Sequence, residues 1–411
     1  MKLRTILIIA ALLTLTMSSM AGQCEAGNSG SAPWPMFMGD AAHSSRSAYD
    51  TSSDPGQAVN WISYWATGNA SVVISARDTI FASTGAVLYR ISSDHVSMNR
   101  YVGNGSLMGT PAIGWNDTAY VGNMDMFIYC LDGNGTLWWD YNTSAPVCSS
   151  PTIVGNDTIY ITSAGLMSFT LDGKLNWRAL QNVTSRSSPA VDGNGTIYFG
   201  GEDGGFYAVD KSGNVLWQLQ TAAPIRTSPS IDSAGNIHFA SDNHVYCVTP
   251  SGSPLWCYNT IAPVSSSVGI RSDDWSLFLS GDGSLIALEP NGSLGWSLKL
   301  DGYNVTRSLA IDSSGICYVG SDSTIYSVQK DGLVRWDYRI STGHVGSPAI
   351  TRNGTVVFGS STGLFELGQV DEGNEWFVLA TVLLPPLALC AVLIFAARRL
   401  RRDKAVENRG K

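Results

Sequence analysis

The fold of this chain is decided by the stretch Ser188-Pro-Ala-Val-Asp-Gly-Asn-Gly-Thr-Ile-Tyr-Phe-Gly-Gly201, which continues as Gly205-Phe-Tyr-Ala-Val-Asp210 and Gly213-Asn-Val-Leu-Trp217. Apolar and aromatic segments alternate here with Gly, Asn and Asp, a pattern typical of short β-strands joined by tight turns. The stretch therefore predicts four strands, A, B, C and D, with Trp217 on strand D. Four such strands form one blade of a β-propeller.

The stretch recurs along the chain at a period near forty residues. Six tryptophans are separated by 38, 40, 39, 40 and 40 residues: Trp139, Trp177, Trp217, Trp256, Trp296 and Trp336. The Ser-Pro element recurs at the same spacing, at Thr110-Pro111, Ser150-Pro151, Ser188-Pro189, Ser228-Pro229 and Ser347-Pro348, with weaker copies at Ser71-Val72, Ser267-Val268 and Ser308-Leu309. A fixed period of this length indicates a repeat architecture, and we expect the repeated residues to be structural.

Eight copies of strands A, B and C can be counted, but the eighth stops near Gly368 before any strand D. At the other end of the domain, the sequence Val59-Asn-Trp61-Ile-Ser-Tyr64 resembles that of a predicted strand D, Leu137-Trp-Trp139-Asp-Tyr141. We expect this N-terminal strand to complete blade eight, because closure removes the unpaired sheet edges. The sequence thus predicts an all-β, eight-bladed propeller of four-stranded antiparallel blades over residues 59–368, followed by one C-terminal transmembrane helix.

The ends of the chain predict a membrane-anchored surface protein. Residues 1–22 have the positive start, apolar stretch and small-residue end of a signal peptide, and residues 23–58 form a lead-in segment. After a linker at 369–375, residues 376–397 carry no charge and as a helix would span about 33 Å. The basic tail, 398–411, is expected in the cytoplasm and the propeller outside the cell, with an archaeal cell surface as one setting.

Charge is distributed unevenly between the tail and the ectodomain. The tail has seven Lys or Arg and two acidic residues, whereas the ectodomain after the signal peptide has 16 basic and 31 acidic residues, a net charge of −15. Nucleic-acid binding needs a basic surface. The composition therefore excludes a nucleic-acid partner and leaves a surface protein or small ligand, besides the membrane itself.

The repeat text resembles the pyrroloquinoline-quinone (PQQ) repeat of the quinoprotein-alcohol-dehydrogenase-like superfamily. The resemblance rests on Ser188-Pro-Ala-Val191, Thr196-Ile-Tyr-Phe-Gly200, Phe206-Tyr-Ala-Val-Asp210 and Gly213-Asn-Val-Leu-Trp217, and it covers roughly residues 34–368. The lead-in from Trp34 through Asp40 and His43 to Arg46 also resembles the segment that opens such domains. The family includes quinoprotein dehydrogenases and a propeller lipoprotein of outer-membrane assembly.

The resemblance favours the non-enzymatic branch. Dehydrogenases of this family are similar in having a vicinal disulfide, a calcium ion and an Asp base, whereas this chain has no Cys-Cys pair. We therefore expect no catalytic residue, no PQQ and no calcium, and we interpret the Asp residues of the B–C turns as turn formers. The five histidines, at 43, 95, 238, 244 and 344, show no metal-ligand spacing, so no metal site is predicted.

One candidate ligand site lies on the D–A connections. Arg186 and Arg226 occupy equivalent positions two residues before the Ser-Pro element, and Arg307 lies nearby in blade seven. Three arginines around one channel mouth are candidates for holding an anionic ligand. The favoured alternative is that they are scattered surface charges paired with local acids. Because the chain leaves blade eight from a strand C, this D–A and B–C face is expected to point away from the membrane.

Two further sets of residues are candidates for modification. Eleven Asn-x-Ser/Thr sequons are present, and those outside Asn-Gly turns on the predicted outward face are the better glycosylation candidates: Asn69, Asn142, Asn182 and Asn304. Six cysteines precede the predicted membrane span and can pair in fifteen ways. Cys247 and Cys257 flank one C–D hairpin and form the candidate disulfide, unless they serve as small buried residues.

The function predicted from sequence is a binding or scaffold module at the cell surface. The first alternative is a membrane-tethered PQQ-dependent oxidoreductase, and the second is a sensor whose basic tail contacts anionic lipid or a partner.

Overall fold

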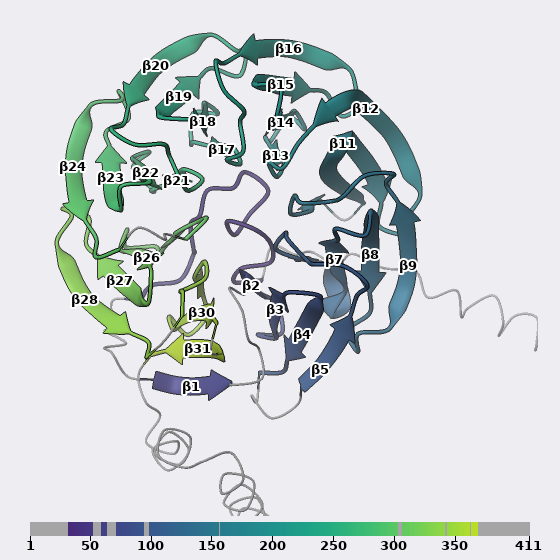
Figure 1. Ribbon diagram of the computed structural model, residues 1–411, viewed down its shortest axis with the longest axis horizontal. Helices are drawn as coiled ribbons and strands as arrows, with labels where there is room; N and C mark the ends of the chain where they lie inside the picture. The colour runs from purple at the N-terminus through teal and green to yellow at the C-terminus, as the bar shows by residue number, and fades with distance from the viewer. Residues whose placement is uncertain are drawn as a thin grey trace, which may run out of the picture.

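The computed structural model describes residues 32–51, 59–63, 71–93, 98–155, 157–302, 306–341, 343–361 and 363–368. Within these residues, eight antiparallel sheets stand around a common centre (Figure 1). Seven sheets have four strands and one has three. The predicted eight-bladed, all-β propeller is confirmed.

The blades follow one another in chain order. Blade one consists of β2 (Ser71–Ile74), β3 (Ile80–Thr84), β4 (Val87–Ile91) and β5 (Met98–Val102), and blade two of β6 (Ala112–Ile113), β7 (Ala119–Gly122), β8 (Phe127–Leu131) and β9 (Leu137–Asn142), with a short 3-10 helix, η2 (Trp115–Asp117), between β6 and β7. Blade three consists of β10 (Thr152–Val154), β11 (Thr158–Thr170) and β12 (Leu175–Thr184), and blade four of β13 (Ala190–Val191), β14 (Ile197–Gly200), β15 (Gly205–Val209) and β16 (Val215–Gln220).

The second half of the ring repeats this arrangement. Blade five consists of β17 (Ser230–Ile231), β18 (Ile237–Ser241), β19 (His244–Val248) and β20 (Pro254–Asn259), and blade six of β21 (Gly269–Ile270), β22 (Ser276–Leu279), β23 (Ser284–Leu288) and β24 (Leu294–Lys299). Blade seven consists of β25 (Ala310–Ile311), β26 (Cys317–Ser321), β27 (Thr324–Val328) and β28 (Val334–Arg339), and blade eight of β29 (Ala349–Ile350), β30 (Val356–Ser360), β31 (Gly363–Leu367) and β1 (Val59–Ser63).

Blade three joins strands B and C into one long element. The first part of β11 pairs with β10 and the second with β12, and Gly165, with φ +92°, lies at a register shift between Ala164 and Leu166, both of which pair with β12. Glycine adopts such a φ without strain, which suits it to this irregularity in the pairing of β11 with β12.

The ring is closed by the strand nearest the N-terminus. β1 pairs antiparallel with β31, in a register that places Ile62 opposite Phe365. The prediction that residues near Trp61 supply the missing strand D is confirmed. Asn99 and Arg100 lie on strand D of blade one (β5), where the other blades carry the repeated tryptophan. Closure by the two ends of the domain leaves no blade with an unpaired outer strand C.

Five of the six repeated tryptophans join their blade to the next one through an indole hydrogen bond, whereas Trp336 Nε1 is buried without a partner among the described residues. The indole N–H of Trp217 donates to the carbonyl of Pro250 at 2.8 Å, and its ring lies against Gly252 in the C–D turn of blade five. The same bond, at 2.8–2.9 Å, is made by Trp139, Trp177, Trp256 and Trp296. The expected packing of tryptophan between neighbouring blades is confirmed, and the indole hydrogen bond adds direction to it.

The Ser-Pro element forms a second link between blades, nearer the centre. The Ser188 hydroxyl accepts a hydrogen bond from the Ser150 backbone N–H at 2.9 Å, and the Ser228 hydroxyl accepts one from the Ser188 N–H. The same bond joins Thr110 to Ser150, Ser228 to Ser267, and Ser308 to Ser347. Serine therefore recurs at this position because its hydroxyl reaches the backbone of the preceding blade.

The lead-in segment fills the centre of the ring, which the sequence did not predict. Residues 32–51 cross the middle of the propeller (purple in Figure 1), and their backbone carbonyls accept hydrogen bonds from the inner strands A in succession. The amides of these strands and their carbonyl partners, at 2.7–3.0 Å, are Ile74 with Trp34, Ile113 with Pro35, Val191 with Ala41, Ile231 with Ala42, Ile270 with Ser44 and Ile311 with Ser45.

The backbone of this segment is held in an unusual conformation. Met38, His43 and Ser45 have φ between 55° and 60°, in the left-handed region that non-glycine residues seldom adopt. His43 is fully buried, and its Nδ1 lies 3.1 Å from the Pro229 carbonyl oxygen. Burial lowers the pKa of His43 to about 4, so the imidazole is neutral at physiological pH and donates its Nδ1–H to Pro229.

Several sequence-based predictions lie outside the described residues. They are the signal peptide at 1–22, the transmembrane helix at 376–397 and the basic tail at 398–411. Among the residues that the structure does describe, no helix has the length and apolar character needed to cross a membrane.

The contact between Trp217 and Gly252 predicts that Gly252→Ala destabilises the propeller by about 2 kcal/mol, since an added Cβ would lie 2.8 Å from the indole at a φ of +83°. Gly193→Ala is the matched control, because its Cβ would meet no atom within 4 Å. Urea unfolding followed by tryptophan fluorescence measures both free energies of unfolding. Equal stability of the two variants would contradict this description of the interblade contact.

The buried neutral His43 predicts a pH-dependent contribution to stability. Its folded pKa, about 4, lies below the ordinary value of 6.5, so the unfolded chain binds the proton first as pH falls. The contribution is complete above pH 6.5 and is lost towards pH 4, by about 3 kcal/mol in total. We expect His43→Gln to remove this part of the pH dependence of unfolding, whereas the exposed His344→Gln retains it. An unchanged slope in His43→Gln would contradict the burial of a neutral imidazole.

Candidate functional site

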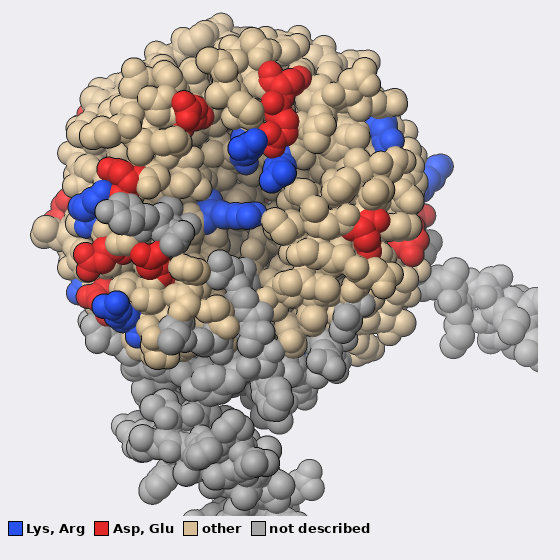
Figure 2. Space-filling view, in the orientation of Figure 1, with Lys and Arg blue, Asp and Glu red and all other residues tan. Residues whose placement is uncertain are grey.

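A cavity of about 330 Å³ opens at the centre of one face of the propeller. The connections that lead into blades two to eight contribute to its wall, together with Ser71 at the start of β2 and Phe37 of the lead-in segment. Figure 2 shows this face, with Lys and Arg atoms gathered around the central hollow and an acidic group beside them. The cavity is a closed cup rather than an open channel, because the lead-in segment lies across the centre of the ring.

The structure brings the three predicted arginines together. Arg186, Arg226 and Arg307 all line the cavity, and they are the charged residues among its described lining. The D–A connections of three different blades carry them, so equivalent positions in the repeat converge on one space. The three side chains line one space at the centre of the D–A face, and ligand binding there remains a prediction.

Two of the arginines share one carboxylate. Arg226 contacts both oxygens of Glu202, with N–O distances of 3.0–3.1 Å, and Nε of Arg186 lies 3.4 Å from Oε1 of the same group. The hydrogen bond to Glu202 raises the pKa of Arg226, so its charge is permanent. Both guanidinium side chains are nevertheless more than 60% exposed, and each retains N–H groups that face solvent.

Arg307 makes no ion pair with any residue in the described part of the chain. Its side chain is exposed, and it lines both the central cavity and an adjoining hollow of about 320 Å³. With one carboxylate for three guanidinium groups, the site carries two positive charges more than negative ones. Pairing with a local acid therefore explains Arg186 and Arg226 in part and does not explain Arg307.

Hydroxyl groups complete the polar lining of the cavity. Five serines of the interblade links contribute to it: Ser150, Ser188, Ser228, Ser267 and Ser347. Each of these hydroxyl oxygens accepts a backbone hydrogen bond from the preceding blade. Their O–H groups have no acceptor among the described residues. A hydroxyl that already accepts can still donate, so the wall presents a ring of donors below the arginines.

The cavity does not offer the ligands that a quinoprotein calcium site requires. Its described lining contains no carboxylate and no side-chain amide, and a hard divalent cation prefers such oxygen ligands. The Asp residues of the B–C turns serve the turns themselves: Asp203 accepts the Gly205 N–H at 3.0 Å and the Tyr207 hydroxyl at 2.6 Å. The donor set therefore fits an anion and does not supply oxygen ligands from side chains for a calcium ion.

The predicted disulfide between Cys247 and Cys257 is not present. Both are free thiols, and the register explains why: Cys247 lies opposite Trp256, whereas Cys257 lies opposite Tyr246. Neighbouring residues of a strand point to opposite faces, so the two sulfur atoms lie on different sides of the sheet. Burial raises the pKa of the Cys247 thiol to about 12.

Two of the four glycosylation candidates, Asn142 and Asn182, lie among the described residues. Asn142 is the last residue of β9 and Asn182 lies within β12, and both are exposed. Both therefore belong to strands rather than to the connections between blades. Asn69 and Asn304 lie outside the described residues, and glycosylation at all four remains a prediction.

Sequence reasoning missed three features of the sites. Phe37 belongs to the lead-in segment, whose path the repeated sequence does not predict. The serines that can donate hydrogen bonds were interpreted as structural residues only. The third feature is a buried group of Asp232, His238 and Cys247, which arises because strand pairing joins residues that have no ligand spacing in sequence. A comparison of paired positions between blades would have revealed it.

Comparison with known proteins supports the repeat assignment. A family model described as outer membrane protein assembly factor BamB matches residues 61–238 and 241–375, and no curated protein matches the chain. BamB from Moraxella catarrhalis is 16% identical, with a TM-score of 0.62 over 75% of this chain and 100% of that one.

Two enzymes of known structure have the same fold. A europium-containing methanol dehydrogenase is 10% identical, with a TM-score of 0.68 over 80% of this chain and 89% of that one. The quinohemoprotein alcohol dehydrogenase from Comamonas testosteroni is 13% identical, with a TM-score of 0.68 over 82% of this chain and 81% of that one. The neighbours thus include both BamB and two dehydrogenases, and these low identities show a shared fold alone.

The difference in burial between Cys247 and Cys257 predicts different rates of alkylation of the two thiols. We expect iodoacetamide to modify the exposed Cys257 in the native protein, and to modify the buried, protonated Cys247 only after denaturation. Peptide mapping by mass spectrometry measures both, and Cys257→Ser provides the control for labelling at that strand. Recovery of the two residues as a cross-linked, unlabelled peptide would contradict the register.

Proposed function

We propose a binding function for this chain, which belongs to the family of PQQ-repeat propellers described as outer membrane protein assembly factor BamB. The central cavity holds an anionic ligand, or an anionic group of a partner, that carries carboxylate or phosphate oxygens. The observation that carries this proposal is the convergence of Arg186, Arg226 and Arg307 on one cavity with a single carboxylate among them.

The electrostatic setting favours an anion at this one place. The ectodomain has a net charge of −15, so most of its surface repels anions, while the cavity has an excess of two positive charges. Guanidinium groups bind carboxylate and phosphate in bidentate geometry, and the serine hydroxyls below them can donate further hydrogen bonds. A partly enclosed site also screens these charges less than open solvent does.

The face that carries the cavity supports display away from a membrane. The cavity lies on the D–A and B–C side, whereas β31 ends at Leu367 on the opposite side, where Leu367 pairs with Val356 at the start of β30. If residues 376–397 span a membrane with the propeller outside the cell, as their composition predicts, the cavity faces outward. The chain would then act as a membrane-anchored extracellular module for a soluble ligand or partner.

The alternative function is that of a membrane-tethered PQQ-dependent oxidoreductase. Its support is the fold shared with two dehydrogenases, and its weakness is the lining of the cavity, which lacks oxygen ligands for calcium. Addition of PQQ with calcium, followed by quinone absorbance and alcohol-dependent dye reduction, distinguishes the two. Dye reduction that needs PQQ would favour the oxidoreductase.

Substitutions in the cavity predict opposite effects on anion binding. With citrate as the probe in calorimetric titration at low salt, Arg307→Ala is expected to weaken binding about tenfold, the loss of one charge-assisted hydrogen bond. Glu202→Gln is expected to tighten binding, because it removes the negative charge that competes for Arg186 and Arg226.

The control for net charge is Arg339→Ala, an exposed arginine on β28 that does not line the cavity. It should leave citrate binding unchanged. If Arg339→Ala weakens binding as much as Arg307→Ala does, or if Glu202→Gln has no effect, the cavity is not the anion site.

A further inference from the structure

One cross-strand pair in blade five departs from the repeat. Strand B faces strand C with a tyrosine opposite a small residue in other blades, as in the pairs Tyr120–Cys130, Tyr198–Ala208 and Tyr318–Ser327. In blade five the corresponding pair is His238–Cys247. This blade alone, among these four, places an imidazole directly beside a thiol.

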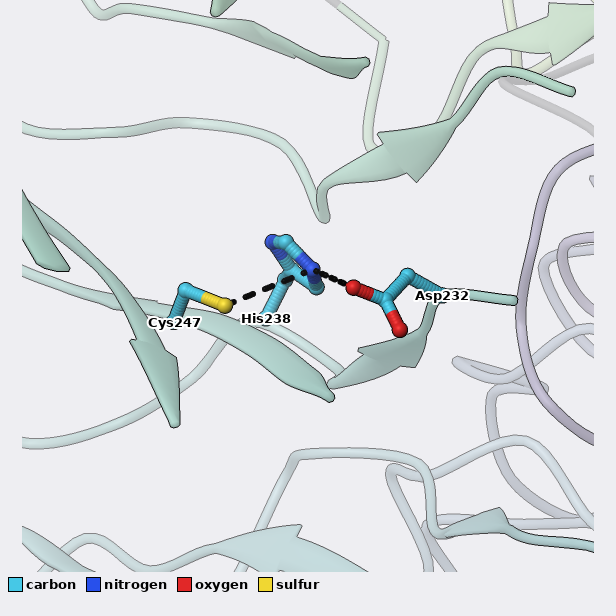
Figure 3. A group of neighbouring side chains, drawn as sticks. All are labelled: Asp232, His238 and Cys247. Carbon is cyan, nitrogen blue, oxygen red and sulfur yellow. Dashed lines mark hydrogen bonds and ion pairs between the residues drawn. The ribbon is translucent and has the colours of Figure 1, made fainter. Parts of the chain in front are cut away.

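A carboxylate completes the group. Oδ2 of Asp232, which follows β17, lies 3.2 Å from Nε2 of His238, and Sγ of Cys247 lies 3.6 Å from the same nitrogen. All three side-chain atoms are within 4.8 Å of one another. Figure 3 shows the three side chains converging from consecutive strands of the blade. His238 and Cys247 are 1% and 2% exposed, and the Asp232 side chain is 8% exposed.

A second blade supplies a partner for the other imidazole nitrogen. The hydroxyl of Ser276, on β22 of blade six, lies 3.1 Å from Nδ1 of His238. Three preceding blades have isoleucine at the position of Ser276: Ile159, Ile197 and Ile237. A polar residue therefore replaces an apolar one where it can orient the imidazole, so departures from the repeat on two blades meet at one point.

The geometry points to a buried Zn²⁺ site formed by Asp232 Oδ2, His238 Nε2 and Cys247 Sγ. Oxygen, imidazole nitrogen and thiolate sulfur are the ligands that zinc takes in proteins, at about 2.0–2.3 Å. Tetrahedral ligands at those distances lie roughly 3.3–3.6 Å from one another, close to the separations of 3.2 and 3.6 Å seen here. Two of the three separations thus match a zinc-sized ion, and the third, between Asp232 Oδ2 and Cys247 Sγ, is within 4.8 Å.

Binding changes the protons of the group in a defined way. The thiol proton of Cys247 is released to solvent, since the thiolate is the ligand. Nε2 of His238 binds the ion through its lone pair, so the single imidazole proton resides on Nδ1 and is donated to the Ser276 hydroxyl. Partners of this kind fix the tautomer of metal-bound histidine in other proteins.

A bound ion would stabilise the folded propeller by cross-linking three strands of blade five. Its ligands come from the end of strand A, from β18 and from β19, and Ser276 adds a contact from blade six. An ion bound only by the folded chain stabilises it by mass action. This role is independent of the anion cavity, whose lining includes none of these residues.

The same side chains could instead form only hydrogen bonds. In blade four, the Tyr198 hydroxyl donates to Asp192 at 3.1 Å, and His238 stands in the corresponding position beside Asp232. That relation provides the best variants. His238→Tyr with Cys247→Ala reproduces the Tyr198–Ala208 pair of blade four and keeps a donor to Asp232, so the blade should fold without a metal.

The test uses the full-length chain, without a histidine tag, expressed in medium supplied with Zn²⁺ or Co²⁺. We expect one metal per chain by elemental analysis. The cobalt form should show the visible spectrum of tetrahedral Co²⁺ and a thiolate-to-cobalt charge-transfer band in the near ultraviolet. The double variant should fold and lose the metal, Ser276→Ala should weaken affinity about 10–100-fold, and Cys130→Ala, at the equivalent position of blade two, should change nothing.

Each other outcome overturns the inference. Metal content that is unchanged in the double variant would place the ion elsewhere. Cobalt bound without a charge-transfer band would show that Cys247 is not a ligand. A metal-free wild-type chain with the same thermal midpoint with and without added Zn²⁺ would leave the group as a hydrogen-bonded cluster only.

Discussion

The propeller depends on how its innermost strands satisfy their backbone amides. Within its sheet, strand A of each blade pairs with strand B only. Its other edge faces the centre of the ring, where water is excluded because nearly all of the strand A residues are buried. Unpaired amides there would cost free energy and would offer an edge for pairing with other chains. The carbonyls of residues 34–45 accept these bonds from blades one and two and from blades four to seven. The lead-in is therefore part of the core rather than an appendage.

This arrangement also explains the form of the candidate site. Because the lead-in lies across the centre, the D–A face has a cup instead of a channel, and Phe37 lines it. The serine hydroxyls that link the blades ring the same space, so one repeated residue both joins neighbours and supplies donors. Residues of both proposed sites depart from the repeat. They are Arg186, Arg226 and Arg307 in the cavity and the His238–Cys247 pair in blade five.

The sequence predicts the features that depend on local periodicity. The spacing of the tryptophans and the turn residues together predict eight blades. The sequence around Trp61 predicts closure of the ring by an N-terminal strand. Equivalent repeat positions placed Arg186 and Arg226 on one face correctly. The path of the lead-in could not be predicted, because residues 32–51 bond to strands that lie up to about 270 residues away and have no repeat of their own. The Cys247–Cys257 pairing failed because their proximity in sequence concealed the alternation of side chains along a strand.

The most direct test of this account is residue-resolved hydrogen exchange at the inner-strand amides of Ile113, Val191, Ile231, Ile270 and Ile311 in the native protein. These amides donate to lead-in carbonyls at 2.8–3.0 Å. They should exchange as slowly as the amides of the buried strands B and C, through global unfolding alone. Exchange at the rate of exposed strand D amides would show that the lead-in does not hold the centre of the ring, and would contradict the account.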